Sequence, residues 1–143
     1  MAIEWKDSFA TGIVEIDRHH KAIFGKIGSL VAAVDRGKGE RELLEILDFL
    51  DDYTRTHFSV EEKLQQDNLY PHYILHKEEH RLFHETIDQL RERLVREGFS
   101  PHLILLGGRT MTRWLIQHIC SMDRDFGKYI RAERIIALNE TRH

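Results

Sequence analysis

Histidine is the residue that stands out in this 143-residue chain, which contains ten of them. Five histidines and one glutamate occupy positions that helical periodicity assigns to the protein interior: His20, His57, Glu61, His76, His80 and His118. Buried imidazoles and carboxylates cost free energy unless a partner satisfies them. Both groups are also good ligands for transition metals. These residue types at these positions therefore indicate a metal site inside the protein.

The number of candidate ligands, seven when Asp123 is included, constrains the metal. A structural zinc takes four ligands in a closed tetrahedron, so seven are too many for one zinc. Two six-coordinate metals would be satisfied, apart from one open position, by five imidazoles, two carboxylates that bridge them and one bridging oxygen. A small ligand can bind at such an open position. Imidazole with carboxylate suits iron or manganese better than a thiolate-seeking metal.

Four long helical segments position these side chains, and we predict them over 17–36, 40–66, 71–96 and 101–127. Short Gly-, Pro- and Asn-containing breaks separate the segments. Apolar residues recur in steps of three and four along each segment, which is typical of amphipathic helices that share a core. Because the connections are short, consecutive helices should be antiparallel. The predicted fold is all-α, an up-down-up-down four-helix bundle.

The antiparallel arrangement brings the candidate ligands to one end of the bundle. They lie near the starts of the first and third helices and near the ends of the second and fourth. A single buried histidine is usually an ordinary core residue, but four helices that contribute at one depth favour a metal site. Asp123 follows His118 by five positions, which places the two side chains about 140° apart on a regular α-helix. Either Asp123 reaches sideways or the helix widens into a π-turn.

The whole chain is interpreted as one domain spanning 1–143. It consists of an N-terminal arm (1–16), the bundle (17–127) and a short, basic, helical C-terminal extension (128–143). A net charge of −3 argues against nucleic acid as a partner. One cysteine fits a reducing compartment. The first ten residues show no secretory leader and no apolar run could span a bilayer. We expect a cytoplasmic monomer without membrane insertion, and the protein partner stays open.

Several sequence pieces together resemble the hemerythrin family, specifically its single-domain bacterial members. They are the IDRHHK segment at 16–21, HFSVEE at 57–62, the HxxxH pair at 76–80, and WLIQHI at 114–119 followed by Asp123. The resemblance covers about residues 5–130 and includes all seven candidate ligands in order.

The resemblance implies a non-haem di-iron centre that binds O2 reversibly, as in an oxygen carrier, store or buffer. By that resemblance, one iron takes His76, His80 and His118, and the other takes His20 and His57. Glu61 and Asp123 bridge the two irons together with an oxo or hydroxo group, and O2 binds the second, five-coordinate iron. The family's apolar O2 pocket maps onto Ile23, Phe58, Trp114 and Ile119.

Other polar residues near the candidate ligands are interpreted as ordinary surface or helix positions. His19 stands where the family often has glutamine, and it is predicted to be a rim or surface residue rather than an outer partner of a ligand. Glu62 is predicted to be solvated, and Cys120 to face away from the site. The remaining histidines are predicted on the solvated surface: His72, His84, His102 and His143.

Three functions remain open at this point. The first is an O2-binding protein. The second is a di-iron enzyme that acts on peroxide or nitric oxide, although no further acid, base or polar cleft is visible. The third is an oxygen or redox sensor. Because we expect no attached output domain, such a sensor would have to act through the basic tail around Arg131, Arg134 and Arg142.

Overall fold

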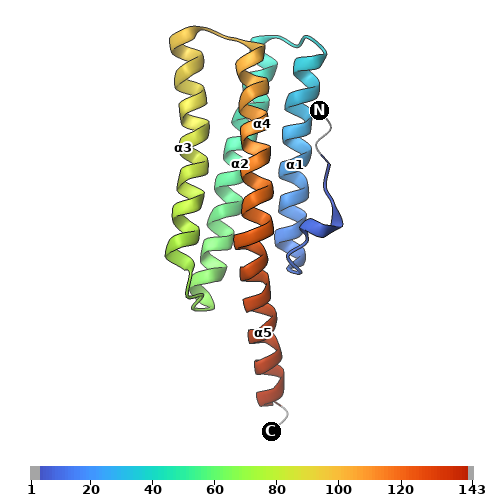
Figure 1. Ribbon diagram of the computed structural model, residues 1–143, viewed down its shortest axis with the longest axis vertical. Helices are drawn as coiled ribbons and strands as arrows, with labels where there is room; N and C mark the ends of the chain where they lie inside the picture. The colour runs from blue at the N-terminus through green and yellow to red at the C-terminus, as the bar shows by residue number, and fades with distance from the viewer. Residues whose placement is uncertain (1–3, 142–143) are drawn as a thin grey trace.

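The computed structural model describes residues 4–141 and confirms the predicted helical bundle. The four helices that form it within this range are α1 (Val14–Asp35), α2 (Glu40–Asp67), α3 (Tyr73–Glu97) and α4 (Pro101–His118). They lie side by side, each running opposite to the one before (Figure 1). Each packs against its two neighbours around the ring, α1 against α4 included. The described residues contain no strand.

The helix boundaries follow from local chemistry. Ser100 precedes α4, and its hydroxyl accepts a hydrogen bond from the backbone N–H of Leu103, while Pro101 occupies the first helical position. The turn after α1 contains Gly37 at φ +69°, a left-handed conformation that costs glycine least. These two short connections keep α1 adjacent and antiparallel to α2, and α3 adjacent and antiparallel to α4.

The first helix begins at Val14, three residues before the predicted start. The Asp17 carboxylate accepts hydrogen bonds from the backbone N–H and hydroxyl of Thr11 and from the N–H of Gly12. These contacts fold the preceding chain back onto the first turn. The arm itself contains a short 3₁₀ helix, η1 (Asp7–Phe9), whose Phe9 ring stacks on Phe24 of α1.

The C-terminal part of the chain is helical, as predicted, but its boundaries differ. We expected the fourth helix to reach residue 127 and a short helical extension to follow. Instead, α4 passes into a π-helical segment, η2 (Ile119–Asp123), and then into α5 (Arg124–Thr141). Both junction residues, Ile119 and Arg124, have right-handed helical backbone angles. The result is one continuous helical rod that projects beyond the end of the bundle (Figure 1).

Two apolar clusters enclose the end of the bundle where the candidate ligands lie. The larger runs along the bundle and includes Phe58 and Phe83. The smaller joins the arm, the α2–α3 connection and α5: Ile13, Ile16, Tyr70, Phe126 and Ile130. Rings of both clusters contact candidate ligands, so the polar site lies between them. Among residues 4–141, no helix combines the length and the apolar content needed to cross a bilayer.

Candidate metal centre

The seven predicted ligands come together in the structure, from four helices and the π-helical segment. Each of them is at most 4% exposed. The contributions are His20 from α1, His57 and Glu61 from α2, His76 and His80 from α3, His118 from α4 and Asp123 from η2. Within the described chain, their nitrogen and oxygen atoms form two groups that are compact enough to hold a metal ion and that share Glu61.

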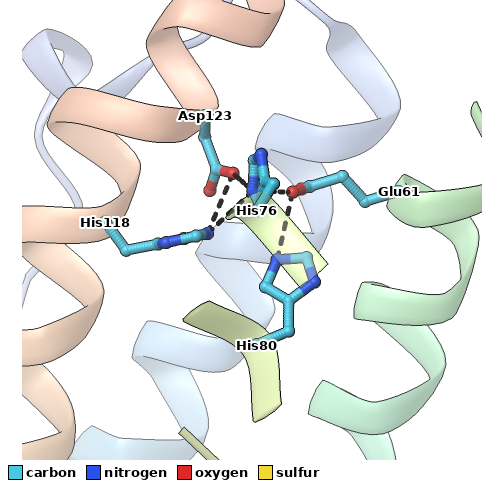
Figure 2. Close-up of side chains that lie close together, drawn as sticks. All are labelled: Glu61, His76, His80, His118 and Asp123. Atoms are coloured by element: carbon cyan, nitrogen blue, oxygen red, sulfur yellow. Dashed lines mark hydrogen bonds and ion pairs between the residues drawn. The ribbon is translucent and has the colours of Figure 1, made fainter. Parts of the chain in front are cut away.

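The first group contains three histidines and both carboxylates (Figure 2). The Nε2 atom of His76 lies 2.6 Å from Oε1 of Glu61 and 2.8 Å from Oδ1 of Asp123. His80 Nε2 lies 3.3 Å from the same glutamate oxygen, and His118 Nε2 lies 3.1 Å from the same aspartate oxygen. The three imidazoles and two oxygens therefore converge on one point.

The second group lies on the other side of the two carboxylates. His57 Nε2 lies 3.4 Å from Oε2 of Glu61. His20 Nε2 lies 3.1 Å from Oδ2 of Asp123. Each carboxylate thus presents one oxygen to the three-histidine group and the other to the two-histidine group. This is the arrangement that two bridging carboxylates require.

The π-helical segment explains how Asp123 reaches the site. On a regular α-helix its side chain would lie about 140° from that of His118. The wider π-turn, with hydrogen bonds from i to i+5, brings residues five apart onto one face. Of the two alternatives that the spacing left open, the structure therefore shows the local π-helix.

The donor set fits a metal pair because its inward-facing atoms lack aligned hydrogen-bond partners. Both oxygens of Glu61, both oxygens of Asp123 and the Nε2 atoms of His57 and His80 are buried without one among the described residues. Unsatisfied buried polar atoms are rare and costly. Cations placed between these lone pairs would satisfy them together, and imidazole with carboxylate suits iron.

The pKa values of the cluster without metal also favour cation binding. Burial lowers the pKa of His76, but its contacts with Asp123 and Glu61 outweigh that effect and raise the pKa to about 10. Burial and the charge of Asp123 raise the pKa of Glu61, yet the imidazoles around it hold that pKa below its usual range. Burial also raises the pKa of Asp123, but the charge and close approach of the His118 imidazole outweigh that effect and hold the pKa well below normal. The two carboxylates therefore stay ionised, and a cation between them would offset their mutual repulsion.

Three of the five histidines have a side-chain partner at the nitrogen that faces away from the centre. The side-chain amide of Gln65 lies 2.7 Å from Nδ1 of His76. Glu62 Oε2 lies 3.0 Å from Nδ1 of His80. His19 Nδ1 lies 3.0 Å from Nδ1 of His57. Such outer contacts fix the orientation and tautomer of a ligand ring.

These partners correct two predictions and add a residue. His19 was expected at the rim, but it is half-buried against His57. Glu62 was expected to be solvated, but its side chain is only 19% exposed and contacts His80. Both predictions were wrong because such residues point between helices, where a neighbouring helix supplies a partner. Gln65 was missed, although it continues the four-residue spacing of His57 and Glu61 and is fully buried.

The other surface assignments have mixed outcomes. His72 and His102 are exposed, as predicted, and His143 lies outside the described residues. His84 was expected on the solvated surface, but it is half-buried with its ring 5.2 Å from that of Phe58. Cys120 is partly buried against the larger apolar cluster. A position between two packed helices, rather than on the outer face of one, explains the burial of His84.

Two of the four predicted pocket residues stack on candidate ligands. The Phe58 ring is parallel to that of His80, with 3.8 Å between centroids. The Trp114 ring stacks on His118 at 4.5 Å. Ile23 and Ile119 are buried in the same apolar cluster. The centre therefore has apolar walls on this side.

The fold and the site together define a metal-binding four-helix bundle, and comparison with known proteins agrees. A family model described as the hemerythrin HHE cation binding domain matches residues 11–130. The chain is 34% identical over 128 residues to the bacteriohemerythrin of Pseudomonas paraeruginosa (strain DSM 24068 / PA7), which covers 89% of this chain and 80% of that protein.

Two further relatives have the same relationship. The chain is 32% identical over 130 residues to the bacteriohemerythrin of Stenotrophomonas maltophilia (strain R551-3), covering 90% of this chain and 81% of that protein. It is 29% identical over 119 residues to the myohemerythrin of Sipunculus nudus, covering 83% and 86% respectively. This chain belongs to the hemerythrin family.

Proposed function

We propose that this protein binds O2 reversibly at a non-haem di-iron centre held by the seven clustered residues. The observation that carries the proposal is that Glu61 and Asp123 each direct one oxygen to the three-histidine group and the other to the two-histidine group. Membership of the hemerythrin family, which is known for oxygen binding at a di-iron site, supports it.

The proposal assigns unequal roles to the two groups. His76, His80 and His118 would hold one iron, and His20 and His57 would hold the other. Glu61 and Asp123 would bridge them together with an oxo or hydroxo group. Because the second iron would have one histidine fewer, it would keep an open position. When bound, the iron pair would supply electrons to O2 on binding and take them back on release.

The residues around the open position decide whether O2 is released unchanged. Ile23, Phe58, Trp114 and Ile119 are proposed to wall it off, and three of these four side chains are at most 2% exposed. A closed apolar wall excludes water and slows the delivery of protons that would let reduced oxygen escape. The chain thereby favours binding over turnover.

The test combines metal analysis with visible spectroscopy. The purified protein should contain two irons per chain. After reduction it should develop an absorption band in air and lose that band under argon over repeated cycles. One zinc per chain would overturn the di-iron assignment. Catalytic turnover of peroxide or nitric oxide without a reversible band would replace binding by an enzymatic function.

A further inference from the structure

Two consecutive residues of α1 contact the two-histidine group from different directions. His20 is one of its two histidines. His19, the preceding residue, contacts the other one, because its Nδ1 atom lies 3.0 Å from Nδ1 of His57. The two rings are nearly perpendicular, at 87°, with 5.1 Å between centroids.

Two ring nitrogens at this distance share one proton, so one donates and the other accepts. The Nε2 atom of His57 faces Glu61 at 3.4 Å and is the nitrogen available to a metal. A neutral imidazole bound to metal through Nε2 carries its proton on Nδ1. His57 then donates, and His19 accepts with its own proton on Nε2.

The position of His19 allows it to accept the Nδ1 proton of His57. Its ring is half-buried and lies edge-on to Tyr53 of α2, with 6.0 Å between centroids and 86° between planes. In the three-histidine group, His76 and His80 have Gln65 and Glu62 as outer partners. In the two-histidine group, the outer nitrogen of His20 has no hydrogen-bond partner among the described residues. The orientation of that group therefore depends on the contact between His19 and His57.

We propose that His19 is a positioning residue for the metal held by His20 and His57. By accepting the Nδ1 proton of His57, it fixes the ring and increases the electron donation of that imidazole to the metal. Partners of this kind raise ligand basicity and affect metal affinity by roughly 10- to 100-fold. The inference rests on the proposed di-iron centre and adds a residue that is not itself a ligand.

The test compares His19→Gln, which keeps an acceptor, with His19→Leu, which removes it. His102→Leu is the matched control, because His102 is an exposed histidine at the start of α4, at the opposite end of the bundle. Metal-free protein is titrated with Co²⁺, whose visible bands report each site. The His19→Leu variant should bind the second equivalent roughly 10- to 100-fold more weakly. The glutamine variant should restore binding, and the control should match the wild type.

A second readout remains informative if the leucine variant folds poorly, as judged by circular dichroism of the metal-free protein. An amide oxygen is a weaker acceptor than an imidazole nitrogen, so His19→Gln should raise the reduction potential of the iron-loaded protein. An unchanged potential in His19→Gln, or unchanged Co²⁺ binding in a folded His19→Leu variant, would overturn the inference. Equal losses in both variants would assign His19 to packing instead. Failure of the wild type to bind a second metal ion would overturn the proposed function and this inference with it.

Discussion

The indole ring of Trp114 lies almost parallel to the imidazole of His118, with 4.5 Å between ring centroids and 14° between planes. The two residues are one helical turn apart on α4, so the helix itself sets the stack. Phe58 makes the corresponding contact with His80 from α2. Aromatic rings therefore cover two ligands of the three-histidine group, and their removal would change both ligand orientation and access of water.

Opening this wall should shorten the lifetime of the oxygenated protein. Trp114→Ala removes a ring from it, and Ile119→Glu places an acid in it. Either change should accelerate conversion to the inert diferric form, roughly tenfold for each 1.4 kcal/mol of lost barrier. Stopped-flow decay of the O2-dependent band measures the rate. Ile104→Ala, a buried change in α4 outside the wall, is the control, and decay as slow as the wild type in both test variants would exclude the proposed wall.

Loss of a bridging carboxylate should cost more iron than loss of a terminal histidine. Glu61→Ala or Asp123→Ala removes a group whose two oxygens face both metal positions, which leaves adjacent cations less neutralised. His20→Ala removes a ligand from one position. Iron per chain after purification, measured by atomic absorption, should therefore be lower in the two carboxylate variants. Equal iron content in all three would contradict the bridging assignment.

The metal-free protein should lose stability as the pH rises from 6.5 to 9.5. The folded-state pKa of His76 is raised to about 10, so its contribution is complete below about 6.5 and disappears as the pH approaches 10. Burial lowers the pKa of His20 and His80, but nearby carboxylates outweigh it and raise the pKa of each, in the same direction. One pKa unit corresponds to about 1.4 kcal/mol. Urea unfolding at the two pH values should differ by a few kcal/mol.

A bound divalent metal provides the control for this pH effect. Metal on Nε2 of His76 prevents that nitrogen from taking up a proton, so the difference between the two pH values should shrink in metal-loaded protein. Identical pH dependence with and without metal would show that the cluster does not control it.

Close packing of α5 against the arm should make Gly127 sensitive to substitution. A Cβ atom at Gly127 would overlap the carbonyl oxygen of Thr11, so Gly127→Ala should destabilise the fold by about 1–3 kcal/mol. Gly25 lies on the exposed face of α1, and apart from its chain neighbours and the nearby backbone of its own helix no atom lies within 4 Å of the added Cβ. Gly25→Ala should stabilise the protein by about 0.5–1 kcal/mol, because alanine favours a helix interior. Denaturant unfolding of both variants checks the pair, and equal changes would contradict the contact.

The helices and the inward position of most candidate ligands follow from local features of the amino-acid sequence. Helical periodicity is a local property, so the four-residue spacings of His57 with Glu61 and of His76 with His80 place each pair on one face. Short connections then force antiparallel neighbours and bring the pairs to one end. Neither feature depends on how the helices are rotated about their axes.

The surroundings of residues that lie between helices depend on how the helices pack. His19 and Glu62 sit beside the inward face, and whether such a residue meets solvent or a partner depends on the rotation and distance of the next helix. Periodicity contains no information on the rotation or distance of the next helix, so His19 and Glu62 were predicted at the surface. In the structure His19 contacts His57 and Glu62 contacts His80. The choice between a sideways reach of Asp123 and a π-helix likewise depended on packing, which places the Asp123 carboxylate among the imidazoles of His20, His76 and His118. Local spacing selects the inward face, whereas packing selects the partners at its edges.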